Sequence, residues 1–243
     1  MYVSKSLKVL TSKKKSYLNS GCCGSVYLVD EFTVLKQYFK STNDALKLND
    51  DVYSTIKEID NDHLIKIYEA YTSIKHFLGY KKGKNSFIID VYLAMRYNEV
   101  EKNILYDQKE YLLENLYSIE NLMKILSNSA ILAGDLSSSN TAFTESSMVL
   151  IDPDSFVHST NTFEENEIEN MKTFIEYIAF LFIDILEKDE SINHVSRSEL
   201  KKKIFLESVR LKSRFDFKNK SITDEFSKSL RFSKSPMEYF TKG

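Results

Sequence analysis

Three oxygen-bearing side chains fall within one short stretch of the sequence and have the chemistry to handle a phosphate group. Asp135 and Asn140 stand five residues apart in a polar loop, and Asp152 follows twelve residues later, where the apolar run 148–151 ends. Phosphoryl transfer needs one carboxylate to orient and accept the proton of an attacking hydroxyl, and two oxygen ligands to hold magnesium on the phosphates. The stretch therefore predicts a phosphoryl-transfer site.

A glycine-containing turn and a lysine within an apolar strand could supply groups that bind phosphate. Gly21 and Gly24 precede the first clear strand, and glycine lets backbone N–H groups approach phosphate oxygens without an intervening side chain. Ten residues after Val26, Lys36 interrupts an apolar run, where a lysine either points outward or pairs with anions. Strand alternation favours an inward position for Lys36, while a purely structural turn at the glycines and a surface lysine stay open as alternatives.

These residues must be positioned by elements that change character along the chain. Up to about Tyr97, short runs rich in β-branched and aromatic residues indicate strands at 26–29, 32–35, 64–68 and 87–95. Between the second and third runs, apolar residues at helical spacing predict one helix through Ala45, Leu48, Val52, Ile56 and Ile59, with Asn43 or Asp44 as its N-cap.

Beyond Tyr97 the pattern is mainly helical. One amphipathic helix is predicted over 112–126, and a second begins near Glu167 and is apolar on nearly every side between Tyr177 and Leu186. Weaker patterns predict helices over 198–211 and 222–230. The sequence thus predicts an α+β fold with a sheet-containing N-lobe over 1–97 and a helical C-lobe over 98–243.

Composition excludes several classes of protein. Six glycines and two prolines among 243 residues disfavour a turn-dense all-β barrel, and a net charge of −2 gives no global attraction to nucleic acid or to a membrane surface. No apolar run is long enough to span a bilayer, so we expect a cytoplasmic protein. Cys22 and Cys23 are adjacent and are poorly placed to form a disulfide or a four-ligand zinc site.

The ordered set of motifs resembles the protein kinase superfamily, as a compact, divergent Ser/Thr protein kinase domain of bacterial type. The segment 19–26 is similar to G-x-G-x-x-G-x-V, with Asn19 in place of the first glycine, and 34–36 is similar to V-A-I-K. The loop from Asp135 to Asn140 is similar to the H-R-D-x-x-x-x-N loop, and 151–154 takes the place of D-F-G. The resemblance covers roughly residues 5 to 190. It implies a bilobal protein-kinase-like fold, with a small antiparallel sheet and one helix in the N-lobe and the catalytic loop in a mainly helical C-lobe.

The resemblance also implies roles for individual residues, with ATP and Mg²⁺ as cofactors. Asp135 is the implied catalytic carboxylate, Asn140 and Asp152 are the implied magnesium ligands, and Lys36 is the implied partner of the α- and β-phosphates. Met95 falls at the gatekeeper position that precedes the segment passing the adenine. The implied nucleotide-binding residues are Asn19, Gly21, Gly24, Val26, Lys36, Met95, Arg96, Tyr97 and Asn98.

The sequence departs from the family pattern at several positions. Val52 occupies the place of the helix-borne glutamate that pairs with the lysine, and Asp51 is a possible substitute one residue away. Ala133 and Gly134 replace the histidine and arginine, so we expect no control by activation-loop phosphorylation. Only about a dozen residues, 155–166, separate the acidic pair from the next predicted helix, which suggests that a platform for a peptide substrate is absent.

Three functions therefore follow as hypotheses. The first is transfer of the γ-phosphate of ATP to a serine or threonine hydroxyl of a protein. The second is a pseudokinase that binds nucleotide or a protein partner without chemistry, suggested by Val52 and by the missing histidine and arginine. The third is a small-molecule kinase of the aminoglycoside or choline kinase type, suggested by the Gly134-Asp135 pair. The partner expected from the sequence is ATP, with a protein or small-molecule substrate that the sequence does not name.

Overall fold

The structure is a computed structural model that describes residues 16–20, 24–30, 33–38, 50–65, 67–71, 86–90, 109–143, 147–188, 194–214, 216–217 and 220–229. The fold is mixed α+β, and the chain forms two compact units. The first unit comprises Met1–Asp60 and Ile65–Met95, and the second comprises Asn61–Leu64 and Arg96–Gly243. The boundary predicted at Tyr97 lies outside the described residues.

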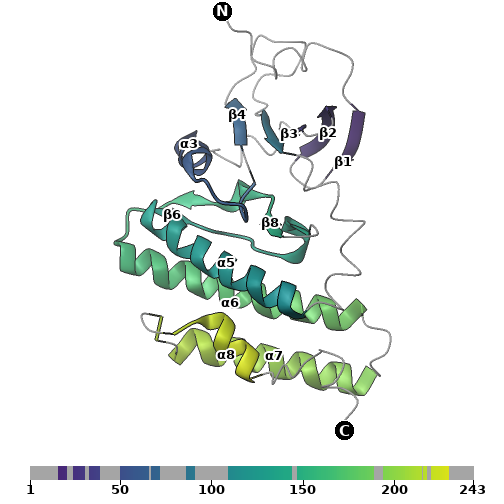
Figure 1. The fold of residues 1–243 in the computed structure, drawn as a ribbon, viewed down its shortest axis with the longest axis vertical. Coiled ribbons are helices and arrows are strands. Elements are labelled where there is room, and N and C mark those ends of the chain that lie inside the picture. The colour runs from purple at the N-terminus through teal and green to yellow at the C-terminus, as the bar shows by residue number, and fades with distance from the viewer. Residues whose placement is uncertain are drawn as a thin grey trace, which may run out of the picture. The chain divides into compact units, whose positions relative to one another are not determined.

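The first unit contains a five-stranded antiparallel sheet and one described helix (Figure 1). The order of the strands across the sheet is β1-β2-β3-β5-β4. Their bounds are Ser16–Ser20 for β1, Gly24–Asp30 for β2, Thr33–Tyr38 for β3, Ile67–Tyr71 for β4 and Ser86–Asp90 for β5. Helix α3, Asp50–Glu58, follows β3 in the chain and packs on β4. Four strand predictions are thereby confirmed in part, whereas β1 was missed.

One predicted strand has a different start. The expected run 64–68 is replaced by β4, which begins at Ile67, and Leu64 instead forms a parallel bridge with Leu150 in the second unit. Both Leu64 and Ile65 are buried, so their apolar character reflects packing rather than membership of the first unit's sheet. A short apolar run cannot distinguish these two environments.

Helix α3 buries two of the residues that helical spacing predicts, whereas the predicted Ile59 follows the end of the helix and is half-buried. Val52 and Ile56 lie one turn apart and are 2% and 1% exposed. The earlier part of the predicted helix, from Asn43 to Leu48, lies outside the described residues.

The second unit is mainly helical (Figure 1). Its helices are α5, Lys109–Asn128; α6, Phe163–Lys188; α7, His194–Arg214; and α8, Ile222–Ser229. Two small antiparallel sheets pair β6, Ile131–Leu132, with β9, Val157–His158, and β7, Thr141–Phe143, with β8, Met148–Leu150. Helices α5 and α6 lie side by side, so the predicted helical character of this part of the chain is confirmed.

Helix α6 differs from its prediction in two respects. It begins at Phe163 rather than near Glu167, because Thr162 and Glu165 form a capping box: the Thr162 N–H donates to Glu165 Oε2 at 2.9 Å and the Glu165 N–H donates to Thr162 Oγ1 at 3.3 Å. Burial on every side was also predicted for the apolar stretch, but Phe180 is 55% exposed.

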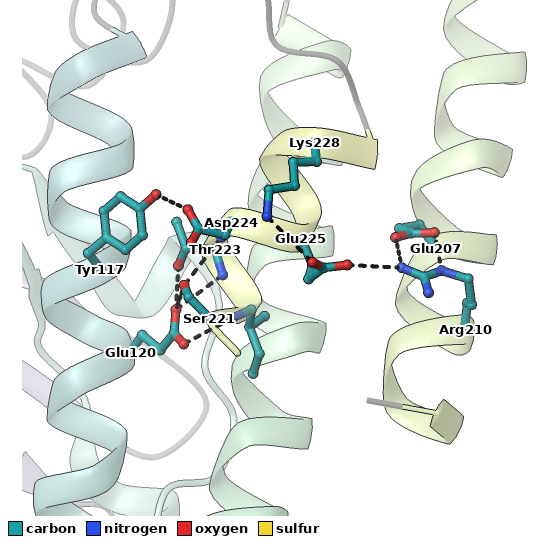
Figure 2. A network of polar contacts seen from close by, with 10 residues as sticks. Tyr117, Glu120, Glu207, Arg210, Ser221, Thr223, Asp224, Glu225 and Lys228 are labelled. Carbon is teal, nitrogen blue, oxygen red and sulfur yellow. Dashed lines mark hydrogen bonds and ion pairs between the residues drawn. The ribbon is translucent and has the colours of Figure 1, made fainter. Parts of the chain in front are cut away.

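A buried carboxylate fixes the last described helix to α5 (Figure 2). Glu120 is 5% exposed and accepts hydrogen bonds from the N–H groups of Ile222 and Thr223 at 3.0 and 3.1 Å. It also accepts from the hydroxyls of Ser221 and Thr223, both at 2.8 Å. These donors include unpaired N–H groups of the first turn of α8, so Glu120 serves as a helix cap supplied by another element.

A second contact joins the same two helices. The hydroxyl of Tyr117 on α5 donates a short hydrogen bond to Asp224 of α8. This bond, with partial burial, raises the pKa of Tyr117 from 10.0 to about 12, because a phenolate beside a carboxylate is unfavourable.

Candidate active site

The predicted phosphoryl-transfer residues lie in the second unit, in the connection between α5 and α6. Helix α5 ends at Asn128, and Ala130 has a φ of 54°, the left-handed conformation that often ends a helix. After β6, residues 133–141 form what we call the 133–141 loop. It contains a 3-10 turn, η1, Ser138–Asn140, and leads into β7.

Asp135 and Asn140 contact each other directly. The Asn140 Nδ2 group donates to the backbone oxygen of Asp135 at 2.9 Å and to its carboxylate Oδ2 at 3.2 Å. Asp135 is exposed and has a φ of 42°, a left-handed conformation that aspartate tolerates better than most residues. The predicted catalytic carboxylate is thus held by one of the predicted magnesium ligands and is open to solvent.

Asp152 follows the strand that pairs with the end of the loop. Thr141 is the partner of Leu150 in the β7–β8 ladder, and the Ile151 N–H donates to the Asn140 backbone oxygen at 3.0 Å. Asn140 is therefore opposite Ile151, the residue that precedes Asp152 in the chain. Asp152 is partly buried and precedes a second 3-10 turn, η2, Pro153–Ser155.

Strand β8, which leads to Asp152, is held in place by two polar side chains. Asn115 Oδ1 accepts from the Met148 N–H at 2.6 Å. His63 Nδ1 lies 2.8 Å from the Met148 carbonyl oxygen, and because a carbonyl can only accept, this nitrogen carries the hydrogen. The His63 carbonyl in turn accepts from the Leu150 N–H at 2.9 Å. His63 thus has a structural contact with β8.

Gly134 brings the loop and the segment after β8 into close contact. A Cβ placed on Gly134 would lie 2.6 Å from the Ser155 backbone oxygen and 3.1 Å from the Ser155 Cβ. Real Cβ atoms do not approach backbone oxygen this closely, so any side chain here would push the two segments apart. The residue before Asp135 must therefore be glycine, because the Ser155 backbone leaves no room for a Cβ at this position.

Asn170 is a positioning residue that the sequence analysis missed. It lies on α6, is fully buried, and its Oδ1 accepts from the Ala133 N–H at 2.7 Å. Its Nδ2 group donates to Ser127 Oγ and to the Ile131 carbonyl, both at 2.8 Å. The available signal was an asparagine one helical turn before the buried Phe174, on the same face of the helix, because a buried amide needs hydrogen-bond partners.

The predicted phosphate-binding residues of the first unit are described only at the level of the sheet. Asn19 lies in β1 and pairs with Val26, and Val26 pairs with Lys36 of the central strand β3. Lys36 also pairs with Phe87 of β5. Gly24 begins β2, whereas Gly21 lies outside the described residues.

Of the remaining predicted residues, the structure describes some and not others. Met95, Arg96, Tyr97 and Asn98 lie outside the described residues. Asp51 is the second residue of α3, and its neighbour Val52 is buried. The position to which the resemblance assigns a glutamate thus holds a buried apolar residue, and the pairing of Asp51 with Lys36 stays a prediction.

No three His, Cys, Asp or Glu side chains within the described ranges gather into a group that could hold a metal ion by themselves. Asn140 is an asparagine, so it does not count among these four residue types, although its amide oxygen can also bind a metal ion. Its amide nitrogen binds Asp135, so its amide oxygen is the group left to bind a cation. The donors that remain are hard oxygens, which suit magnesium.

Comparison with known proteins gives no assignment. No protein-family model matches the chain. No curated protein matches it at a significant level. Among the described helices, none combines the length and the apolar content that crossing a membrane requires.

Proposed function

We propose that the chain is an ATP- and magnesium-dependent phosphotransferase of the protein kinase type, with a bilobal kinase-like fold, that transfers the γ-phosphate to a serine or threonine hydroxyl. The observation that carries the proposal is the pair of hydrogen bonds from Asn140 to Asp135, combined with the backbone bond that pairs Asn140 with Ile151, the residue before Asp152. A carboxylate and two oxygen ligands are the groups that this reaction requires.

The first unit supports the nucleotide-binding part of the proposal. Its strand order, β1-β2-β3-β5-β4 with a helix between β3 and β4, agrees with a small sheet-and-helix lobe. Strands β1 and β2 are antiparallel neighbours, and Val26 of β2 is paired with Lys36 of β3. Lys36 is proposed to bind the α- and β-phosphates, and the segment 95–98 to pass the adenine.

In the proposed reaction, Asp135 orients the acceptor hydroxyl and takes its proton as the phosphoryl group is transferred. Its exposure gives a substrate access, and the bonds from Asn140 fix its carboxylate. Asn140 and Asp152 would hold magnesium. Magnesium commonly binds through one or two carboxylates together with substrate phosphates, and here it would neutralise charge on those phosphates.

A small-molecule acceptor is the second candidate, and one observation favours it. After η2, the chain pairs immediately as β9 with β6, and α6 begins at Phe163. Only residues 156–162 therefore lie between η2 and α6, which leaves little chain for a peptide platform. One observation counts against this candidate, because an acidic pocket among the C-terminal helices would be expected for it. The groove of about 360 Å³ on α7 is instead lined by both acidic and basic side chains.

A nucleotide-binding pseudokinase is the third candidate, and the burial of Val52 favours it. Thermal unfolding with Mg·ATP separates this candidate from the proposal when combined with an activity assay. Ligand at 100 times its dissociation constant stabilises a protein by about 2.7 kcal/mol whether or not phosphate moves. Stabilisation without turnover would support the pseudokinase and contradict the proposal.

The decisive experiment measures transfer of labelled γ-phosphate from ATP, with and without a magnesium chelator. The informative variant is Asp135→Asn, because asparagine also tolerates a positive φ whereas alanine would add strain. We expect label transfer to fall by about a hundredfold or more. The matched control is Asp62→Asn, which changes an exposed aspartate in the same unit and should keep full activity. Transfer that persists in Asp135→Asn would contradict the proposal.

We also propose a cytoplasmic location, where ATP and magnesium are available and where neighbouring cysteines such as Cys22 and Cys23 stay reduced. Fractionation of cells that produce the full chain tests this, and recovery with membranes would contradict it.

A further inference from the structure

Three polar side chains on α6 lie along one side of the helix. Asn170, Tyr177 and Asp184 are spaced by seven residues. Seven residues are close to two turns of 3.6, so successive side chains are rotated by only about 20°. Asn170 binds the start of the 133–141 loop, and the other two bind farther along it.

Tyr177 is connected to both ends of the turn η1. Tyr177 and Thr141 are each fully buried, and their hydroxyl oxygens are 3.1 Å apart. The Thr141 hydroxyl donates to the Ser137 carbonyl at 2.8 Å. A hydroxyl has a single hydrogen, so Tyr177 must be the donor to Thr141. Ser137 precedes η1 and Thr141 follows it, so this chain of bonds joins α6 to both flanks of the turn.

Asp184 holds the turn itself. The Ser138 hydroxyl donates a short hydrogen bond to Asp184 Oδ2, and hydrogen bonds to a charged acceptor are roughly twice as strong as neutral ones. The turn has no buried residue of its own, so no apolar side chain within it fixes its position. Its last residue is Asn140, whose amide holds Asp135.

We infer that Tyr177 and Asp184 are positioning residues for Asp135 and Asn140, acting through Thr141 and Ser138. The kinetic part of this inference rests on the proposed function, whereas the geometric part depends only on the loop. If the two side chains merely stabilised the fold, their loss would lower the melting temperature without a selective effect on the loop or on kcat.

The test uses the full chain and two measurements: amide hydrogen exchange of residues 133–141, and kcat with KM for Mg·ATP. The variants are Tyr177→Phe, which removes one hydroxyl, and Asp184→Leu, which removes the acceptor. Asp184→Asn keeps an acceptor oxygen and serves as the conservative rescue. Ser138→Ala removes the same bond from the loop side and replaces Asp184→Leu if that variant fails to fold.

The structure provides matched controls in the same unit. Tyr117 and Asp224 are also joined by a short hydroxyl–carboxylate hydrogen bond, but between α5 and α8. Tyr117→Phe and Asp224→Leu therefore repeat the two chemical changes away from the loop. Any general loss of stability should appear in these controls as well.

We expect exchange of the loop amides to become about tenfold faster in Tyr177→Phe and Asp184→Leu and to stay at the wild-type rate in both controls. Misplacement of catalytic groups by a fraction of an ångström should lower kcat by about 10- to 100-fold, with KM for Mg·ATP within about threefold of wild type. Asp184→Asn should recover most of both losses.

The opposite results would overturn the inference. Loop exchange at the wild-type rate in both variants, or a kcat no lower than in the controls, would show that α6 does not position the loop. If the wild-type chain transfers no phosphate, the proposed function fails, and the exchange measurement alone then decides the inference.

Discussion

Replacing Gly134 with alanine is the sharpest perturbation of the candidate site, because the structure fixes what the added methyl group would meet. The nearest atom is the Ser155 backbone oxygen at 2.6 Å, about 0.8 Å short of ordinary contact. A backbone oxygen cannot rotate away as a side chain can. The loop and the segment after β8 must therefore separate, and this moves Asp135 relative to Asp152.

The magnitude follows from two opposing effects. Overpacking costs about 1–3 kcal/mol, whereas alanine gains about 0.4–1 kcal/mol by restricting the unfolded chain. We expect a net loss of about 1–2 kcal/mol in the free energy of unfolding. For a chain of this length, that loss lowers the melting temperature by about 2–8 °C. A shift of this size at Asp135 should also lower phosphate transfer by about 10- to 100-fold.

Thermal unfolding and the initial rate of label transfer from ATP measure the two effects. A rescue variant tests the cause: Ser155→Gly removes the Cβ that lies 3.1 Å away but leaves the backbone oxygen. It should therefore fail to restore Gly134→Ala. If Gly134→Ala matches the wild type in both stability and rate, or if Ser155→Gly rescues it, the argument from the backbone contact is wrong.

Three further predictions concern the same unit. Ala130→Gly should raise the free energy of unfolding by about 0.5–1 kcal/mol in a denaturant titration, because glycine relieves the strain of the 54° φ, and a loss of stability would contradict this. Glu120→Ala should lower the free energy of unfolding by about 3 kcal/mol or more in the same titration, because buried N–H groups of α8 lose their acceptor (Figure 2). A loss below about 1 kcal/mol would show that other groups replace the Glu120 carboxylate as acceptor. The folded state raises the pKa of Tyr117 from 10.0 to about 12, so the stabilisation that it contributes is complete below pH 10 and is lost as the pH rises towards 12. Between about pH 10 and pH 12, the free energy of unfolding should therefore decrease more steeply with pH for the wild type than for Tyr117→Phe. Equal slopes for the two proteins would exclude the bond between Tyr117 and Asp224 as the cause.

Elements with strong periodicity were predictable from the sequence. The α5 pattern placed Leu116, Ile119 and Leu122 in the core, where each is at most 1% exposed, and the α3 pattern did the same for Val52 and Ile56. Strand β1 was missed because Ser16–Ser20 has little apolar alternation and depends on pairing with β2. The early start of α6 was missed because it depends on the capping box of Thr162 and Glu165. The prediction placed the start by the apolar pattern alone, and that pattern begins later in the chain.

For the candidate site, spacing predicted the association of Asp135 and Asn140 but not what supports it. The five-residue interval is short enough for one turn of chain to bring these two side chains together. The supporting residues Asn170, Tyr177 and Asp184 are far away in sequence, and their partners on the loop are fixed only by the packing of α6. Long-range contacts of this kind have no local sequence signal.

The placement of Asn61–Leu64 has a practical consequence for dividing the protein. These residues belong to the second unit although their neighbours on both sides belong to the first. A fragment that starts at Arg96 would therefore lack the His63 carbonyl that accepts from Leu150, and it would expose one edge of β8. Open strand edges promote association between chains. Expression of the helical part alone is thus expected to give aggregation, and a fragment joined to 61–64 by a linker would be the better starting point.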